Sequence, residues 1–162
     1  METELMTEND FEIRNITNKD IPAVIEHIHR VCLSSEHLAH PRMEEWMKAD
    51  YNQAALESKL TSSICLLVTG ADGIVGTGFV DIKSGYISGV YVSQQGSGIG
   101  RAIVKKLISE GEAAGIGLFS ASVHPDSLAM QHVLGTAGFE KRHIDPEILY
   151  YVGTDFMIWE RS

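Results

Sequence analysis

Between residues 86 and 123 the spacing of hydrophobic and polar positions changes three times. Residues 86–92 are mainly β-branched, aromatic or small, which is typical of a buried strand. A polar, glycine-rich loop follows, and apolar residues then return at helical spacing up to about Ala114. Gly115 and Gly117 end this predicted helix, and residues 118–123 are the next predicted strand. The stretch therefore predicts a strand–loop–helix–strand unit with two parallel strands.

The same patterns divide the rest of the chain into shorter elements. Strands are predicted at residues 11–16, 64–68, 74–82, 139–144 and 150–159, and helices at residues 21–33, 43–60 and 128–137. Asp20 is expected to cap the first helix, Asp126 or Ser127 to cap the last, and Gly138 to end it. No repeat or linker interrupts this order, so we expect one domain at residues 11–162 after a loose tail at residues 1–10.

Composition and charge exclude some classes of protein without selecting one. The 162 residues are 44% hydrophobic, and the acidic start of the chain lacks the basic and apolar segments of a secretory signal. No apolar run is long enough to span a membrane, so we expect a cytoplasmic protein with no membrane partner. The net charge of −9 argues against non-specific nucleic-acid binding, which depends on neutralising phosphates.

Several histidine and cysteine residues lie close together in the sequence and have to be considered as metal ligands. They are His27, His29, Cys32, His37 and His40. On a helix His27 and His29 would diverge by about 200°, and Cys32 falls on the apolar stripe. We therefore expect solvated histidines, a core cysteine and no metal. Cys65 also lies on a segment that reads as core, so no disulfide framework is expected.

The glycine-rich loop of the central unit is the clearest chemical motif. A helix N-terminus carries free amides and a positive dipole end, and glycines let an anion approach that backbone. A Walker A loop is absent from the sequence, and Arg101 stands where a Rossmann fingerprint needs its last glycine. The run Gln95-Gly-Ser-Gly98-Ile-Gly100 instead fits the pattern Gln/Arg-x-x-Gly-x-Gly/Ala. A glycine turn without a ligand is the alternative for these residues taken alone.

Through this loop and its order of elements, the chain resembles the GNAT superfamily of acetyl-CoA-dependent N-acetyltransferases over residues 11–160. The resemblance implies an α/β fold, in which a mixed, mostly antiparallel sheet of about seven strands is flanked by four helices. It implies acetyl transfer from acetyl-CoA to a primary amine of a small molecule, peptide or protein. The implied cofactor-binding residues are Val90, Tyr91, Val92, Gln95, Gly96, Ser97, Gly98, Ile99, Gly100, Arg101, Ala102 and Ser127.

The resemblance is weaker where a catalytic side chain is expected. Many GNAT proteins carry Asn-x-x-Ala-x-x-Phe-Tyr before a Gly-Phe pair, and the tyrosine protonates the leaving thiolate. The corresponding positions here are Ser127, Met130, Val133 and Leu134. Because Leu134 cannot donate a proton, we take Tyr91 and His124, at the ends of adjacent predicted strands, as the catalytic candidates. The alternative is a catalytically silent acyl-CoA-binding sensor or regulatory module.

The resemblance also suggests where partners bind. Residues 34–51 are expected to line the site of the amine acceptor, as the equivalent helices do in GNAT proteins. GNAT proteins often dimerise through their last strands, so residues 150–159 are a candidate homodimer interface. A monomer is equally compatible with the sequence.

Overall fold

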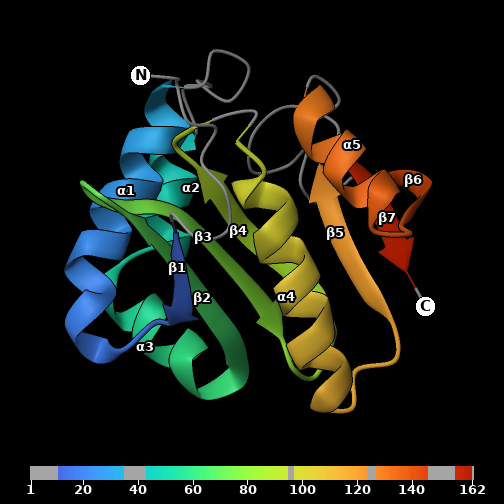
Figure 1. The fold of residues 1–162 in the computed structure, drawn as a ribbon, viewed down its shortest axis with the longest axis horizontal. Coiled ribbons are helices and arrows are strands. Elements are labelled where there is room, and N and C mark those ends of the chain that lie inside the picture. Colours follow the sequence, from blue (N-terminus) through green and yellow to red (C-terminus); the bar gives the residue numbers. More distant parts are fainter. Residues whose placement is uncertain (1–10, 35–42, 95–96, 124–126, 146–155, 162) are drawn as a thin grey trace, which may run out of the picture.

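The computed structural model describes residues 11–34, 43–94, 97–123, 127–145 and 156–161, whose backbone builds one seven-stranded sheet (Figure 1). The strands are β1 (Glu12–Asn15), β2 (Ser63–Gly70), β3 (Gly73–Asp81), β4 (Tyr86–Val92), β5 (Phe119–Val123), β6 (Glu140–Asp145) and β7 (Phe156–Arg161). Their order is β1-β2-β3-β4-β5-β7-β6, and every adjacent pair is antiparallel except β4 and β5. The predicted mixed, mostly antiparallel sheet is confirmed. The predicted tail at residues 1–10 and residues 150–155 of the last predicted strand lie outside the described residues.

Five α-helices and one short 3-10 helix occur in the described part of the chain. They are η2 (Asn18–Asp20), α1 (Ile21–Ser34), α2 (Met43–Asp50), α3 (Gln53–Ser62), α4 (Ile99–Ala113) and α5 (Leu128–Thr136). None of them has the length and apolarity that crossing a bilayer requires.

The helix predicted over residues 43–60 is two helices, α2 and α3, because Asn52 interrupts it. Its side-chain Oδ1 accepts a hydrogen bond from the amide of Ala55 at 2.8 Å, which caps the start of α3. Its Nδ2 donates to the carbonyl of Lys48 at 2.8 Å, which satisfies a carbonyl at the end of α2. This one side chain explains why the described residues form five helices where the sequence predicts four.

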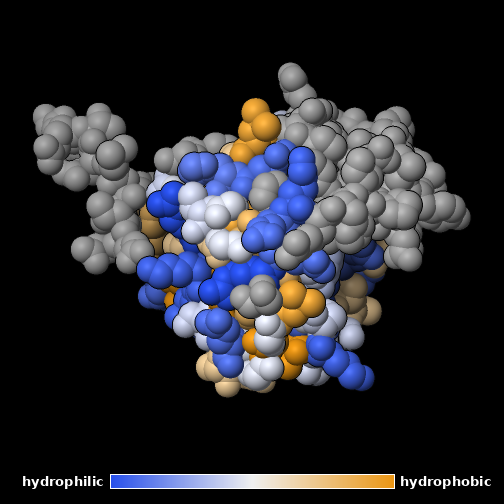
Figure 2. All heavy atoms as spheres, turned by 90° about the vertical axis from the view of Figure 1, so that its right-hand side faces the viewer, coloured by the Kyte–Doolittle hydropathy of each residue, from blue (hydrophilic) through white to orange (hydrophobic). Residues whose placement is uncertain are grey.

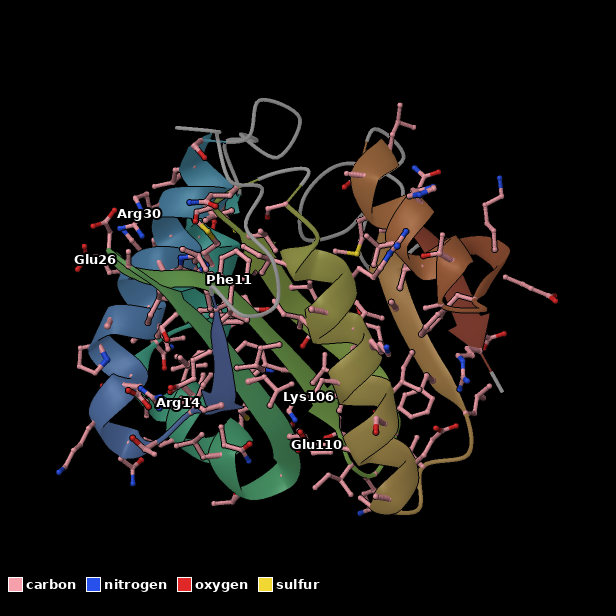
Figure 3. The ribbon with its side chains drawn as sticks, viewed as in Figure 1. Phe11, Arg14, Glu26, Arg30, Lys106 and Glu110 are labelled. Atoms are coloured by element: carbon pink, nitrogen blue, oxygen red, sulfur yellow. The ribbon has the colours of Figure 1, made fainter. Side chains whose placement is uncertain are left out.

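Asp20 was expected to cap α1, but it ends η2 and closes the turn before α1. Its carboxylate accepts hydrogen bonds from the amide and hydroxyl of Thr17 at 2.7 and 2.9 Å. Arg14 of β1 (Figure 3) donates to both carboxylate oxygens at 2.8 and 2.9 Å. These bonds from Arg14 hold the pKa of the Asp20 carboxyl well below its ordinary value. The connection from β1 into α1 is therefore fixed by a two-pronged ion pair.

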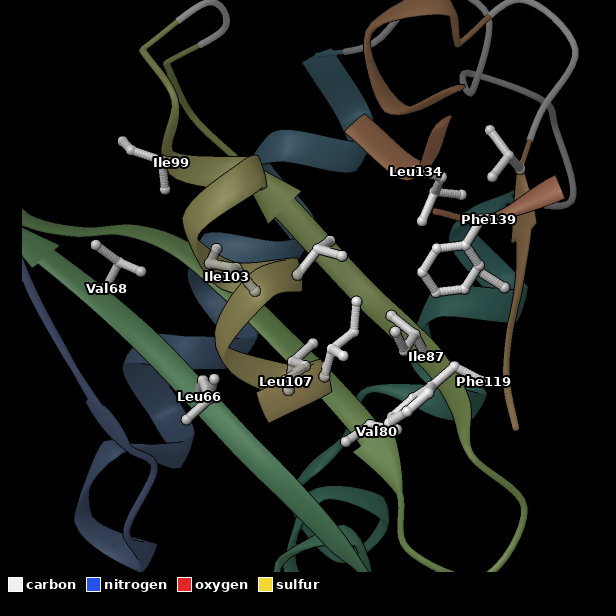
Figure 4. Close-up of a cluster of buried hydrophobic side chains, with 14 of the residues drawn as sticks. Leu66, Val68, Val80, Ile87, Ile99, Ile103, Leu107, Phe119, Leu134 and Phe139 are labelled. Atoms are coloured by element: carbon white, nitrogen blue, oxygen red, sulfur yellow. The ribbon is translucent and has the colours of Figure 1, made fainter. Parts of the chain in front are cut away.

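The helices lie on both faces of the sheet, and each face buries its own hydrophobic cluster. We call the cluster beneath α4 and α5 the α4-side core; Figure 4 shows Leu66, Ile87, Ile103, Phe119 and other members of it. We call the cluster beneath α1, α2 and α3 the α1-side core. Cys32 and Cys65 are buried free thiols in the α1-side core, as the sequence predicts.

Two glycines of β3, Gly76 and Gly78, allow α4 to lie close to the sheet. A Cβ atom at Gly78 would come within 2.4 Å of Ile103 Cγ2. We therefore expect Gly78→Ala to lower the free energy of unfolding by about 2 kcal/mol through overpacking, measured by urea denaturation. Gly117→Ala, where a new Cβ meets nothing within 4 Å, should change it by less than about 0.5 kcal/mol. Equal stabilities of the two variants would contradict this account of the contact.

Candidate functional site

The parallel strands β4 and β5 are paired at one end only. Their register contains two pairs, Tyr86 with Ser120 and Ile87 with Ala121. Beyond these pairs β4 continues to Val92 and β5 to Val123, and Figure 1 shows the two arrows moving apart. We call the parts of β4 and β5 that do not pair with each other, residues 88–92 and 122–123, the strand fork. An extended ligand lying between these two strands can pair with their backbone.

A bulge in β4 shapes one side of the strand fork. Thr77 of β3 opposes Tyr91, whereas Phe79 opposes Ser88, so β4 contains one extra residue. The bulge includes Gly89, whose φ of +63° is in the left-handed region that favours glycine. A Cβ atom there would lie 2.5 Å from the Phe79 ring and 3.1 Å from the Tyr51 hydroxyl. The buried Thr77 hydroxyl donates to the Gly89 carbonyl at 2.8 Å and holds the bulge in place.

The bulge also changes which face each later residue of β4 occupies. Regular alternation would place Tyr91 on the same face as Ile87, in the α4-side core. Instead, Val90 and Val92 pack against the α4-side core, and Tyr91 packs against the α1-side core. The predicted cofactor-binding triplet of residues 90–92 is therefore part of the strand fork, with Tyr91 directed away from α4.

The first turn of α4 lies at the open end of the strand fork. Gly98 caps this helix with φ +83°, and the first backbone bond of the helix runs from Ala102 N to Gly98 O at 3.0 Å. The amides of Ile99, Gly100 and Arg101 have no partner among the described residues. Such amides, together with the helix dipole, can bind an anion, and we call this first turn the anion site. Of the predicted loop residues, Gln95 and Gly96 lie outside the described residues.

Tyr91, a predicted catalytic residue, lies among other ionisable side chains. Its ring meets the Tyr51 ring edge-on, with centroids 5.9 Å apart. Burial, together with the neighbouring Tyr51 and Cys32, raises the pKa of the Tyr91 hydroxyl well above its ordinary value. At neutral pH the Tyr91 hydroxyl is therefore protonated and can donate a hydrogen bond, but it cannot act as a base.

The sequence predicts solvated histidines in this segment, and for His27 this prediction is wrong. His27 is 1% exposed. Its Nε2 donates a hydrogen bond to the Tyr91 carbonyl at 2.9 Å, while its buried Nδ1 has no partner among the described residues. The signal in the sequence was the position of His27 three residues after Val24, on the apolar stripe of α1. His27 ties α1 to the end of β4; His37 and His40 lie outside the described residues.

The buried His27 should make stability depend on pH. Burial lowers the pKa of His27 from its ordinary value of 6.5, so the unfolded chain takes up this proton before the folded chain does. The contribution of neutral His27 to the free energy of unfolding should therefore be fully present above about pH 6.5. It should decrease as the pH drops below that value. His27→Gln, which keeps an N–H donor, should flatten urea-denaturation stabilities between pH 7.5 and 5.5. An unchanged slope would show that other groups cause the dependence; Asp20 titrates only at lower pH.

The remaining predicted residues lie around α5. His124 lies outside the described residues, and Ser127 precedes α5 without a side-chain capping bond. Leu134 is 1% exposed and packs in the α4-side core with Phe139 (Figure 4). Among the residues with described positions, no three His, Cys, Asp or Glu side chains gather closely enough to hold a metal ion.

Comparisons with known proteins agree with this arrangement. The sequence model of the Acetyltransferase (GNAT) family matches residues 24–139, which include the strand fork and α4. No curated protein sequence matches the chain.

Solved structures share the fold at low sequence identity. The PaiA N-acetyltransferase from Thermoplasma acidophilum, in complex with coenzyme A, has a TM-score of 0.74 at 18% identity, over 94% of this chain and 98% of its own. YncA from Salmonella typhimurium, a putative acetyltransferase with acetyl-CoA, has a TM-score of 0.71 at 18% identity, over 95% and 94%. The ribosomal-protein-S5-alanine acetyltransferase from Vibrio fischeri has a TM-score of 0.69 at 20% identity, over 99% and 94%. Because the family model matches more than half of the chain, and its fold is that of these enzymes, the chain belongs to the GNAT family of acetyltransferases.

Proposed function

We propose that this protein is an N-acetyltransferase that moves an acetyl group from acetyl-CoA to a primary amine of a small molecule, peptide or protein. The observation that carries the proposal is the strand fork with the anion site of α4 at its open end. An elongated molecule with phosphates at one end and amide groups along its length fits this pair of features. The coenzyme A and acetyl-CoA in the PaiA and YncA structures support the same assignment.

In this proposal the main chain does most of the binding. Residues 90–92 of β4 pair with the pantetheine arm. Backbone amides of residues 95–101 bind the pyrophosphate, since the Ala102 amide already donates to the Gly98 carbonyl. We also assign Ser127, which precedes α5, to the cofactor site. Because backbone groups supply these contacts, the site tolerates wide changes of side chain, which agrees with identities of 18–20% to the three similar structures.

The chemistry that the chain must assist is the transfer of an acyl group from sulfur to nitrogen. Acetyl-CoA supplies an activated acetyl group, since a thiolate leaves readily. The amine nitrogen bonds to the acetyl carbon, the carbon–sulfur bond breaks, the nitrogen loses a proton and the sulfur gains one. We assign His124 to the removal of the amine proton and the protonated Tyr91 hydroxyl to hydrogen-bond donation.

A catalytically silent acyl-CoA sensor is the second candidate. The observation that favours it is the burial of Leu134 in the α4-side core, since this position holds no proton donor. Such a protein would use the same strand fork and anion site but would not release coenzyme A.

The first experiment combines binding with turnover. Acetyl-CoA, but not NAD, should raise the melting temperature of the protein. Release of free coenzyme A thiol from acetyl-CoA should then depend on the amine added, tested over polyamines, amino acids and N-terminal peptides. Tight binding with no release over the panel would favour the sensor. The absence of any stabilisation by acetyl-CoA would contradict both candidates.

The proposal also includes the cellular location and the binding partners of the protein. We infer a cytoplasmic, single-domain protein over residues 11–162 that binds no membrane. Its net charge of −9 argues against binding to nucleic acid. A homodimer through the last strands stays part of the proposal. Figure 2 shows the side of the molecule that lies at the right in Figure 1, and the coloured residues there are a mixture of hydrophilic and hydrophobic ones.

A further inference from the structure

A side-chain hydrogen bond crosses from β4 to β5 at the closed end of the strand fork. The Tyr86 hydroxyl donates to the Ser122 hydroxyl at 2.8 Å. Tyr86 is the first residue of β4 and pairs with Ser120 of β5, whereas Ser122 is the first residue of β5 beyond the pairing. Ile87 and Ala121, their neighbours in the chain, belong to the α4-side core, so Tyr86 and Ser122 lie on the opposite face, toward α1 and α3.

The Tyr86–Ser122 bond and the anion site of α4 lie at opposite ends of the strand fork. Between them β4 runs from Ser88 to Val92, about 13 Å at roughly 3.3 Å per residue. A ligand whose phosphates are bound by the first turn of α4, and whose arm pairs with β4, therefore points its far end toward Tyr86 and Ser122. In an acyl-CoA that far end is the acyl group.

Beside the bulge, the α1-side face of β4 is filled by Phe79 and Tyr51 of the protein's own core. A Cβ atom added to Gly89 would lie 2.5 Å from the Phe79 ring. Tyr51 is 3% exposed and Phe79 1% exposed, and the Thr77 hydroxyl holds the Gly89 carbonyl. Carbons added to an acetyl group would have to extend toward Tyr86 and Ser122 instead.

We propose that Tyr86 and Ser122 set the acyl-chain length that the protein accepts, restricting it to acetyl and excluding four-carbon and longer acyl groups. This inference rests on the proposed function, because it needs an acyl-CoA in the strand fork. The hydrogen bond holds the Tyr86 ring across the gap between the strands, so the ring, rather than a mobile side chain, meets the end of the acyl group.

Calorimetric titration with coenzyme A, acetyl-CoA and butyryl-CoA tests this inference without knowledge of the amine. For the wild type we expect butyryl-CoA to bind at least tenfold more weakly than acetyl-CoA, as steric rejection of added methylenes predicts. Tyr86→Ala should bring the two dissociation constants within threefold of each other and leave that of coenzyme A unchanged. If Tyr86→Ala does not fold, Ser122→Gly, a smaller change that removes the hydrogen bond to Tyr86, should lower the same ratio of dissociation constants.

Leu118→Ala is the matched control, because Leu118 is 49% exposed and directly precedes β5. It should keep the wild-type ratio of dissociation constants. Two results would overturn this inference alone. One is equal binding of butyryl-CoA and acetyl-CoA by the wild type. The other is an unchanged ratio of dissociation constants in a folded Tyr86→Ala or Ser122→Gly variant that binds coenzyme A. Failure of coenzyme A itself to bind the wild type would overturn the proposed function and this inference with it.

Discussion

Gly100→Asp is expected to weaken acetyl-CoA binding at least 100-fold, which corresponds to about 2.7 kcal/mol. Gly100 is the second residue of α4, and its amide is one of the three without a described partner. A Cβ atom there would lie 3.7 Å from Val92 and 4.0 Å from Val133, so the new carboxylate has room beside the anion site. It would repel the bound phosphates and compete with them for the amides.

The same substitution should leave the fold intact, which separates a binding defect from unfolding. A carboxylate in the first turn of a helix interacts favourably with the helix dipole, and aspartate has a higher helix propensity than glycine. The free energy of unfolding of Gly100→Asp should therefore equal or exceed that of the wild type. Ser109→Asp, which adds the same charge at an exposed position farther along α4, is the matched control for calorimetric titration. Equal acetyl-CoA affinities of Gly100→Asp and Ser109→Asp would rule out the anion site.

The sequence predicted the central unit well because its signals are local. Each signal comes from residues that are close together in the sequence: the strand of residues 86–92, the glycine loop after it, and the apolar stripe of α4. Gly98, which needs a left-handed φ to begin α4, is read directly from the loop motif. Most other strands were also predicted, since their hydrophobic runs end at clear turn residues.

The errors concern side chains whose role depends on hydrogen bonds or on distant contacts. Asn52 divides the helix predicted over residues 43–60 because its side chain hydrogen-bonds both to the end of α2 and to the start of α3. The spacing of apolar residues does not reveal these two hydrogen bonds. His27 is buried because its N–H reaches the Tyr91 carbonyl, 64 residues away in the sequence. The position of His27 on the apolar stripe indicates burial, but the sequence does not identify the carbonyl that satisfies its N–H.

The bulge in β4 is the feature of the site that the sequence analysis could not supply. A bulge is recognised only when β4 is aligned with its partner β3, because three steps along β4 there oppose two steps along β3. Tyr91 could be named as a candidate from its position at the end of the strand. Its direction toward α1 could not be predicted, because regular alternation from Ile87 gives the opposite face.

Gly89→Ala is expected to lower the free energy of unfolding by about 3 kcal/mol, the largest effect on stability that we predict. Two costs of similar size combine. A non-glycine residue at a φ of +63° is strained by about 1 kcal/mol or more, and overpacking in a filled core typically costs about 1–3 kcal/mol. The new methyl group would lie 2.5 Å from the ring of Phe79, a residue that is only 1% exposed.

Urea denaturation of Gly89→Ala and Gly135→Ala measures this effect against a matched control. Gly135 lies within α5, has no left-handed φ, and a new Cβ there meets nothing within 4 Å. Gly135→Ala should therefore stabilise the protein by about 0.5–1 kcal/mol through helix propensity. If Gly89→Ala proved as stable as the wild type, β4 would have to be able to lose its bulge. Tyr91 would then return to the face of Ile87, and the strand fork would not depend on the bulge, contrary to the site described above.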